Sequence, residues 1–211
     1  MPAVPFLDTI HGRHVFQRRV RVLSQHLAGL LPPHAQVLDV GCGDGLIARR
    51  ILDLRPDLHL RGLDIFIRPH THVPVDRFDG ITLPLADQSV DCVMFVDVLH
   101  HTPDPMRLLR EAKRVARQAI LLKEHAREGL LAGPTLRFMD WVGNARHGVV
   151  LPYNYWTKDQ WERAFSELGL EVREWHERIG LYAAPLDLIF GRRLHFITRL
   201  DIAAATAAGS A

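Results

Sequence analysis

Val-Leu-Asp-Val-Gly-Cys-Gly-Asp-Gly, residues 37–45, is the stretch that decides the fold of this chain. An apolar, β-branched run ends in an acid and then carries glycine at every second position. An amphipathic segment follows at once, from residue 46 to residue 52, so the order predicts a strand, a tight turn and a helix. Glycine lets the backbone take positive φ and approach a bound molecule closely. The first turn of a helix also offers unpaired N–H groups, so we expect a ligand at this turn.

The composition fits one domain with a sizeable core. The chain has 211 residues, of which 47% are hydrophobic, and its formal net charge is +2. This balance does not require nucleic acid or a membrane surface as a partner. The two cysteines, Cys42 and Cys92, form no CxxC motif, which favours a reducing cytoplasm over a disulfide framework. Residues 1–5 lack the pattern of a signal peptide, and no apolar stretch reaches the roughly 18 residues of a membrane span.

Strands and helices alternate along most of the chain. Apolar positions spaced by four and three predict a helix over 12–31. Strands are predicted near 35–40, 59–64, 73–78, 90–96, 119–123, 170–179 and 194–202, with helices near 45–55, 105–117 and 157–168. We therefore expect an α/β fold: a Rossmann-like doubly wound sheet, mostly parallel with an antiparallel C-terminal strand, and helices on both faces. It would form a single domain over 1–202, followed by a flexible tail over 203–211.

Polar side chains follow each predicted parallel strand at the point where the strand ends. They are Asp39 with the glycines, Asp64, Asp79, Asp97 with two histidines, and Glu124 with His125. In open parallel sheets the ligand lies at the carboxyl ends of the strands. Agreement among five strand ends therefore predicts one functional edge.

Known nucleotide-binding patterns fit the glycine turn poorly. A P-loop needs a lysine after the glycines, and none is present. A dinucleotide fingerprint needs G-x-G-x-x-G, but the third glycine comes one residue early, at Gly45. A short-chain dehydrogenase would also carry Tyr-x-x-x-Lys, whereas Thr157 and Asp159 follow the two tyrosines Tyr153 and Tyr155. A nicotinamide cofactor is thus disfavoured.

Residues 38–45 strongly resemble motif I of the class I S-adenosylmethionine (SAM)-dependent methyltransferases. The resemblance continues in order through Asp64, then Asp79 with residues 83–91. Residues 98–105 resemble the strand-four exit of the small-molecule "type 11" group of these enzymes. Together these elements cover about residues 34–125. They imply methyl transfer from SAM, with S-adenosylhomocysteine (SAH) as the product.

The resemblance implies a SAM site around the turn and the next strand ends. Gly41 and Gly43 would admit the methionine end, Asp64 would accept hydrogen bonds from the ribose diol, and Asp79 would accept one from the adenine amino group. Asp97 would either reach the SAM ammonium or support the turn, and Cys42 is expected to fill space rather than to act in redox chemistry. The predicted cofactor residues are Asp39, Gly41, Cys42, Gly43, Asp64, Ile65, Asp79, Gly80 and Asp97.

The methyl acceptor has to be inferred from the remaining strand ends and from the long connection 126–156, a predicted lid. Positioning supplies much of the rate of methyl transfer, and a base helps only if a hydroxyl must lose its proton. We predict a small-molecule hydroxyl, with His101 first and His125 second as general base. Trp141, Tyr155 and Trp156 fit either a pocket or the core of a docked lid. The predicted acceptor residues are His100, Glu124, Asp140, Trp141, Asn144, His147, Tyr153, Asn154 and Tyr155.

Three other possibilities follow from the same residues. No metal is predicted, because His100, His101, His125 and His147 lack a tight ligand spacing such as H-E-x-x-H, although Glu124 and Asp140 add ligand types. A non-catalytic SAM-binding regulatory protein is one alternative function, and an NAD(P)-dependent oxidoreductase is a weaker one. No nucleic acid or membrane partner is expected, because no basic stripe interleaved with aromatic residues occurs. The sequence leaves the acceptor's identity and the oligomeric state open.

Overall fold

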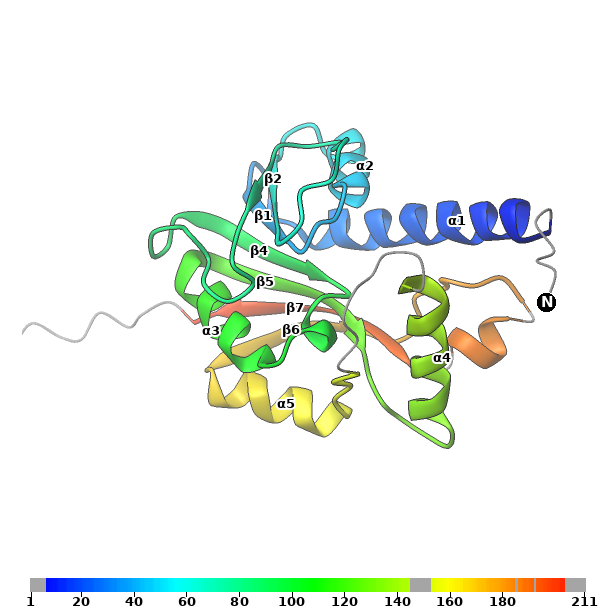
Figure 1. Ribbon diagram of the computed structural model, residues 1–211. Coiled ribbons are helices and arrows are strands. Elements are labelled where there is room, and N and C mark those ends of the chain that lie inside the picture. The colour runs from blue at the N-terminus through cyan, green and yellow to red at the C-terminus, as the bar shows by residue number, and fades with distance from the viewer. Residues whose placement is uncertain (1–6, 145–152, 185, 192, 204–211) are drawn as a thin grey trace, which may run out of the picture.

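A computed structural model describes residues 7–203, apart from residues 145–152, 185 and 192. Its centre is a seven-stranded sheet in the order β3-β2-β1-β4-β5-β7-β6 (Figure 1). The strands are β1 (Gln36–Val40), β2 (His59–Asp64), β3 (Val75–Arg77), β4 (Val90–Val96), β5 (Ala116–His125), β6 (Leu170–His176) and β7 (His195–Ile202). The first five pair in parallel, whereas β7 runs antiparallel to both β5 and β6. The predicted mixed, doubly wound sheet is confirmed.

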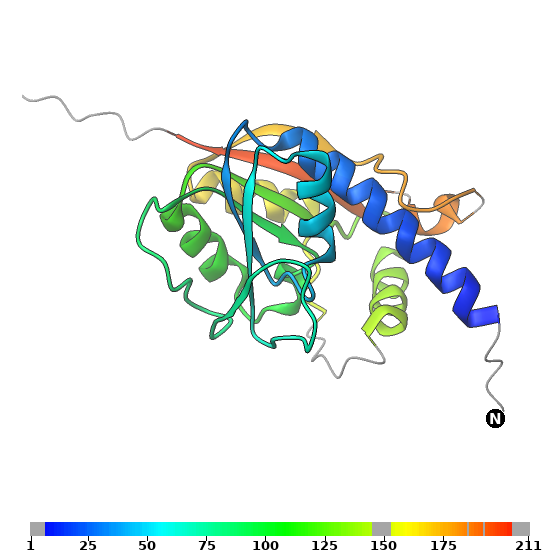
Figure 2. The ribbon, with the colours of Figure 1, turned by 90° about the horizontal axis from the view of Figure 1, so that it is seen from above.

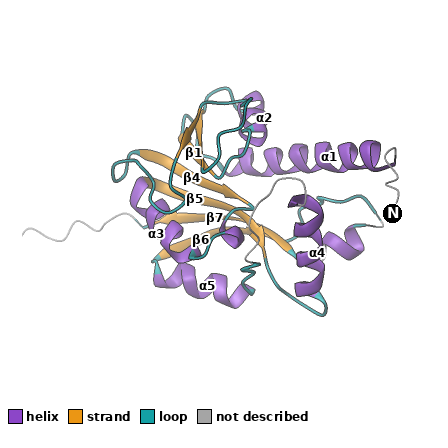
Figure 3. Cartoon of the chain, viewed as in Figure 1, coloured by secondary structure: helices purple, strands orange, loops and turns teal. Residues whose placement is uncertain are grey.

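Helices cover both faces of this sheet (Figures 2 and 3). On one face α1 (Leu7–Leu30) and α2 (Leu46–Leu54) pack on Val37, Cys92 and Leu121. The neighbouring positions on the same strands, such as Leu38, Val93 and Leu122, face α3 (Pro105–Val115) and α5 (Lys158–Glu167). Because both faces are buried, the strands are continuous apolar runs rather than alternating ones.

Local signals set the starts of two helices as the sequence predicts. Asp104 caps α3 by accepting a hydrogen bond from the Arg107 amide, and Pro105 occupies the first turn. Thr157 and Gln160 form a reciprocal capping box at the start of α5. Within the described part of the chain, no helix is both long and apolar enough to cross a membrane.

One helix was not predicted from the sequence. The connection 126–156 contains α4 (Ala132–Asn144), which carries Gly133 and Pro134 near its start. These residues lower helix propensity. Its apolar side chains also give no single buried stripe, since Phe138 and Trp141 are exposed while Leu136 is buried. Two short helical turns, η1 (Leu99–His101) and η2 (Asp187–Gly191), complete the described elements.

The glycine turn is packed between two strand ends. Gly41 and Gly45 adopt φ of +73° and +74°, which L-residues with side chains rarely take. The Gly41 amide donates to the Leu63 carbonyl of β2 at 2.7 Å. A Cβ atom on Gly41 would lie 2.6 Å from Cγ2 of Val98, just beyond β4. The turn therefore contacts the exit of β4 directly and leaves no room for a side chain.

Replacing Gly41 by alanine tests this packing. We expect Gly41→Ala to lower the free energy of unfolding by about 2 kcal/mol, because it combines overlap with backbone strain. Gly29→Ala is the control, since nothing lies within 4 Å of that position in α1, and it should stabilise by about 0.5–1 kcal/mol. Urea denaturation of both variants measures the difference. An unchanged midpoint for Gly41→Ala would contradict the described turn.

Candidate functional site

Asp64 supports the glycine turn from the end of β2. Its Oδ2 accepts a hydrogen bond from the Gly43 amide at 2.8 Å, and its Oδ1 accepts one from the Phe66 amide at 2.9 Å. The residue stays partly exposed, and Ile65 beside it is exposed. The carboxylate predicted to hold a ribose is thus fixed by two backbone donors and still open to a ligand.

Asp39 lies buried beneath the same turn. Its Oδ1 has no hydrogen-bond partner among the described residues. Burial, and then the negative charge of Asp64, raise the pKa of Asp39 to about 8. A buried acid with an unused oxygen matches a cationic ligand group, such as the ammonium of SAM, which would stabilise its charged form. The residues therefore fit the methionine end of SAM.

Asp79 and Gly80 lie at the neighbouring strand end, just beyond β3. Asp79 accepts hydrogen bonds from the Ile81 and Thr82 amides at 2.8 and 2.7 Å. These bonds hold the pKa of Asp79 below its usual value, so the exposed carboxylate remains charged. Gly80 takes φ of +80° and forms part of this turn.

The Cys42 side chain packs against Gly62 of β2. A Cβ atom on Gly62 of β2 would overlap the Cys42 Sγ. Burial, followed by the charges of Asp39 and Asp64, raises the pKa of the thiol above its usual range. The thiol is therefore uncharged and unreactive at neutral pH.

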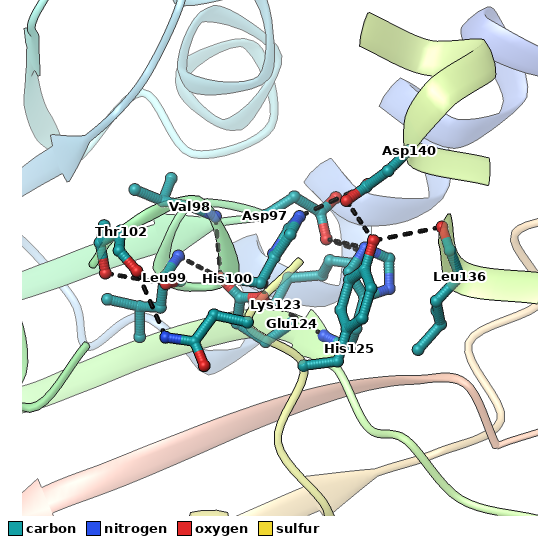
Figure 4. Close-up of polar contacts among 12 residues, drawn as sticks. Asp97, Val98, Leu99, His100, Thr102, Lys123, Glu124, His125, Leu136 and Asp140 are labelled. Carbon is teal, nitrogen blue, oxygen red and sulfur yellow. Dashed lines mark hydrogen bonds and ion pairs between the residues drawn. The ribbon is translucent and has the colours of Figure 1, made fainter. Parts of the chain in front are cut away.

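Glu124 organises a second group of polar side chains at the ends of β4 and β5 (Figure 4). It is fully buried. Its Oε1 accepts hydrogen bonds from the amides of Val98 and Leu99 at 2.8 and 2.6 Å. Its Oε2 lies 2.7 Å from Nδ1 of His100 and accepts from the His125 amide at 3.3 Å. Four protein groups therefore occupy the carboxylate that was predicted to bind the acceptor.

His100 and His101 follow on the η1 turn that Glu124 caps. His100 is buried, and its Nε2 forms an ion pair with Oδ1 of Asp140 at 3.5 Å. Burial alone would lower its pKa, but Glu124 and Asp140 together raise it to about 10. The His101 ring lies 4.0 Å from the His100 ring, is half-buried, and has an unpartnered Nδ1. Burial, and then the charge of His100, lower the pKa of His101.

Asp97 directly follows β4 and adopts a left-handed conformation, with φ of +57°. Arg19 of α1 and Lys123 of β5 both donate to its carboxylate, and His125 Nε2 lies 3.4 Å from it. Burial alone would raise its pKa, but these cations hold the pKa well below its usual value. Two cations therefore already neutralise the acid that was predicted near SAM.

His125 lies deeper than His101. It is buried, its Nδ1 is unpartnered, and its ring lies 4.8 Å from that of His195 and 5.8 Å from that of Tyr155. Burial and the charge of Lys123 hold its pKa well below the usual value. Side chains thus enclose this neutral imidazole.

Some residues of the connection 126–156 contact the histidines, and others face outward. Asp140 of α4 accepts a hydrogen bond from the Tyr155 hydroxyl. The Asn154 amide donates to the His100 carbonyl at 3.2 Å, and Tyr153 packs near Arg137. Trp141 is 59% exposed. Asn144 ends α4, and His147 lies outside the described residues.

Sequence reasoning missed three residues of this cluster: Arg19, Lys123 and His195. Lys123 carried a signal, because a lysine in a buried parallel strand needs a partner. It donates to Asp97 and lies 3.2 Å from His195 Nδ1. Arg19 had no such signal, since it shares an exposed-looking helix face with other arginines.

Comparison with known proteins defines the class. A family model of a methyltransferase domain matches residues 11–174. The chain is 33% identical over 110 residues to 27-O-demethylrifamycin SV methyltransferase of Amycolatopsis mediterranei, covering 45% of this chain and 40% of that protein. It superimposes on the S-adenosylmethionine-dependent methyltransferase of Mesorhizobium loti with a TM-score of 0.62 and 19% identity, over 84% and 96% of the two chains. The corresponding enzyme of Aquifex aeolicus gives a TM-score of 0.60 and 17% identity, over 87% and 92%.

The chain therefore belongs to the methyltransferase-domain family. It has the Rossmann-like fold of the SAM-dependent methyltransferases, as the motifs predicted, and SAM is the cofactor that this family implies. The chain spans less than half the length of the curated relatives that it matches.

Removing the Glu124 charge tests its role in the second group. We expect Glu124→Gln to lower the free energy of unfolding by about 3 kcal/mol, because four buried donors lose their anionic acceptor. Glu162→Gln on the exposed face of α5 is the matched control and should change stability by less than about 0.5 kcal/mol. Chemical denaturation followed by circular dichroism compares them. Equal stability of the two variants would refute the buried capping role.

The raised pKa of Asp39 predicts a pH-dependent stability. The folded chain keeps this proton up to about pH 8, whereas the unfolded chain releases it near the ordinary value of 3.8. The contribution of Asp39 is therefore full below pH 3.8 and is lost as the pH rises to about 8. Asparagine has no such proton, so Asp39→Asn should gain stability over wild type between pH 5 and 8, by a few kcal/mol. Melting temperatures of wild type and Asp39→Asn at pH 5 and pH 8 test this. A difference between the two proteins that is the same at both pH values would contradict it.

Proposed function

We propose that this chain transfers a methyl group from SAM to a hydroxyl of a small molecule. One observation carries the proposal: the glycine turn contacts Val98 at the exit of β4, only two residues before His100. The site that fits SAM therefore adjoins the cluster of histidines. Methyl transfer is an in-line displacement at the sulfonium carbon, so the donor and the acceptor must lie next to each other.

The donor site combines the groups at the ends of β1, β2 and β3. Asp39 would face the ammonium, Asp64 the ribose and Asp79 the adenine, with Ile65 and Gly80 beside them. Gly41 and Gly43 would admit the methionine end. The unused oxygen of Asp39 and the backbone-fixed carboxylate of Asp64 support this assignment.

The acceptor site lies on the β4–β5 side. We propose that the hydroxyl loses its proton at His101, because this ring is less enclosed than His125 and has an unpartnered Nδ1. The connection 126–156 would serve as a lid, with Asp140, Asn154 and Tyr155 contacting the histidines from it. The relative named for 27-O-demethylrifamycin SV supports a small-molecule hydroxyl as acceptor. A cytoplasmic location without nucleic-acid or membrane partners completes the proposal.

Calorimetry with SAH tests the donor site. Asp64→Ala should weaken SAH binding about 10- to 100-fold, because it removes charge-assisted hydrogen bonds to the ribose. Asp76→Ala, an exposed acid on β3, is the control and should bind like wild type. Unchanged affinity of Asp64→Ala would show that the ribose assignment is wrong. Binding of SAH without methylation across a broad panel of hydroxyl compounds would favour a non-catalytic SAM-binding protein.

Replacement of His101 tests the acceptor side. His101→Ala should reduce turnover by about 10²- to 10⁴-fold, the usual contribution of a group that removes a proton. Its SAH affinity should stay that of wild type, because the ring lies outside the proposed donor site. Steady-state methylation with labelled SAM, measured together with SAH calorimetry, separates the two effects. Full turnover in this variant would assign proton removal elsewhere.

A further inference from the structure

We infer that Arg19 and Tyr182 form a subsite for a carboxylate, or a similar oxyanion, carried by the methyl acceptor. This inference rests on the proposed function, because it names the class of acceptor: a hydroxyl compound that also bears a negative charge. Arg19 belongs to α1, and Tyr182 belongs to the connection 177–194 between β6 and β7. Figure 2 shows α1 running beside this connection, and Arg18 donates to the Gly180 carbonyl across the contact at 3.1 Å.

The guanidinium of Arg19 uses little of its hydrogen-bonding capacity within the described residues. Its Nη2 donates to Asp97, and it makes no other hydrogen bond or ion pair there. A guanidinium carries five N–H groups in a planar fork that matches the two oxygens of a carboxylate. The Arg19 side chain is 29% exposed, and its remaining nitrogens are not enclosed, so a ligand can reach them.

The charges around Asp97 are unequal in number. Arg19 and Lys123 both pair with its carboxylate, and neither cation pairs with another acid among the described residues. Burial, and then the charge of Lys123, hold the pKa of both His125 and His195 well below the usual value, so these rings are neutral. Two cations therefore face one acid, and a ligand anion would balance them.

Lys123 shows the effect of this imbalance. Burial lowers its pKa most, and the charge of Arg19 lowers it further, although Asp97 and Glu124 raise it. Its Nζ donates to Asp97 and lies 3.2 Å from Nδ1 of His195. An anion bound at Arg19 would favour the charged form of this buried lysine.

Tyr182 adds a neutral donor beside Arg19. Its ring lies 5.9 Å from the His195 ring, and its hydroxyl makes no hydrogen bond with another described residue. Burial raises the pKa of this hydroxyl to about 12, and the nearby charge of Arg19 opposes the rise. The hydroxyl therefore keeps its proton at neutral pH and can donate it to an oxyanion.

Arg19 lies on the acceptor side of the sheet edge. Burial lowers the pKa of His195 most, and the charges of Lys123 and Arg19 lower it further, so Arg19 lies near the start of β7. In the sheet, β7 lies beyond β5, on the side away from β1, β2 and β3. The proposed donor groups are at the ends of those three strands, so an anion at Arg19 belongs to the acceptor.

Calorimetry with benzoate tests the subsite without requiring turnover. The chain saturated with SAH should bind one benzoate, and it should bind benzamide, the neutral analogue, at least 10-fold more weakly. Arg19→Gln should weaken benzoate binding about 10- to 100-fold, because charge-assisted hydrogen bonds are lost, and should leave benzamide binding unchanged. Tyr182→Phe should weaken benzoate binding about 2- to 10-fold, because it removes one neutral donor.

Two further variants serve as controls. Arg21→Gln replaces an exposed arginine of the same helix and should bind benzoate like wild type. Arg19→Lys keeps the charge beside Asp97 but lacks the planar fork, so it should fold like wild type and weaken benzoate binding about 10-fold. Circular dichroism and SAH affinity show which variants are folded.

Methylation assays with labelled SAM extend the test to the acceptor itself. The panel pairs hydroxy acids with their carboxamides, for example 4-hydroxybenzoate with 4-hydroxybenzamide. Wild type should show a kcat/KM at least 10-fold higher for the acid of a pair that it methylates. Arg19→Gln should abolish this preference, and its SAH affinity should stay that of wild type.

The outcomes separate this inference from the proposed function. Benzoate binding that Arg19→Gln leaves unchanged would overturn the subsite, as would the absence of binding by wild type. A loss of SAH affinity in Arg19→Gln would assign this arginine to the donor and overturn the inference. Equal methylation of acids and amides would overturn the subsite but leave methyl transfer intact. Benzoate binding that depends on Arg19, in a chain that binds SAH but methylates no acceptor, would support the subsite while refuting the proposed function.

Discussion

The arrangement of side chains at the ends of β4 and β5 depends on the buried carboxylate of Glu124. This carboxylate accepts hydrogen bonds from two amides of the turn after β4, and it also fixes His100 and the end of β5. Removing a charge from water is costly unless several donors surround it, so the four donors and Glu124 require one another. The positions of His100 and His101 follow from this single acceptor.

Ionic contacts extend this arrangement to α1 and to α4. Arg19 of α1 and Lys123 of β5 meet at Asp97, whereas Asp140 of α4 meets His100. Ionic contacts at this buried edge therefore join two helices that lie about 100 residues apart in the sequence to the ends of β4 and β5. The geometry of the site therefore depends on how α1 and α4 are placed against the sheet.

Prediction from the sequence succeeded where the signal was local. The glycine turn, the buried strands, the N-cap at Asp104 and the capping box at Thr157 all depend on neighbouring residues, and the structure confirms them. It failed for α4, because Gly133 and Pro134 weaken the helical pattern and its apolar side chains do not form one buried stripe. The contact between His100 and Asp140 likewise had no local signal, because Asp140 lies 40 residues further along the chain.

The sequence by itself determined the family, the order of strands and helices, and the acids at the ends of β1, β2 and β3. These features are short-range patterns, and the parallel sheet brings strand ends to one edge whatever the details of packing. Only the tertiary structure decided that Glu124 is fully occupied, that Arg19 and Lys123 neutralise Asp97, and that Asp140 meets His100. Those pairings join residues far apart in the chain, so they depend on how helices pack on the sheet and on which buried charges then find partners.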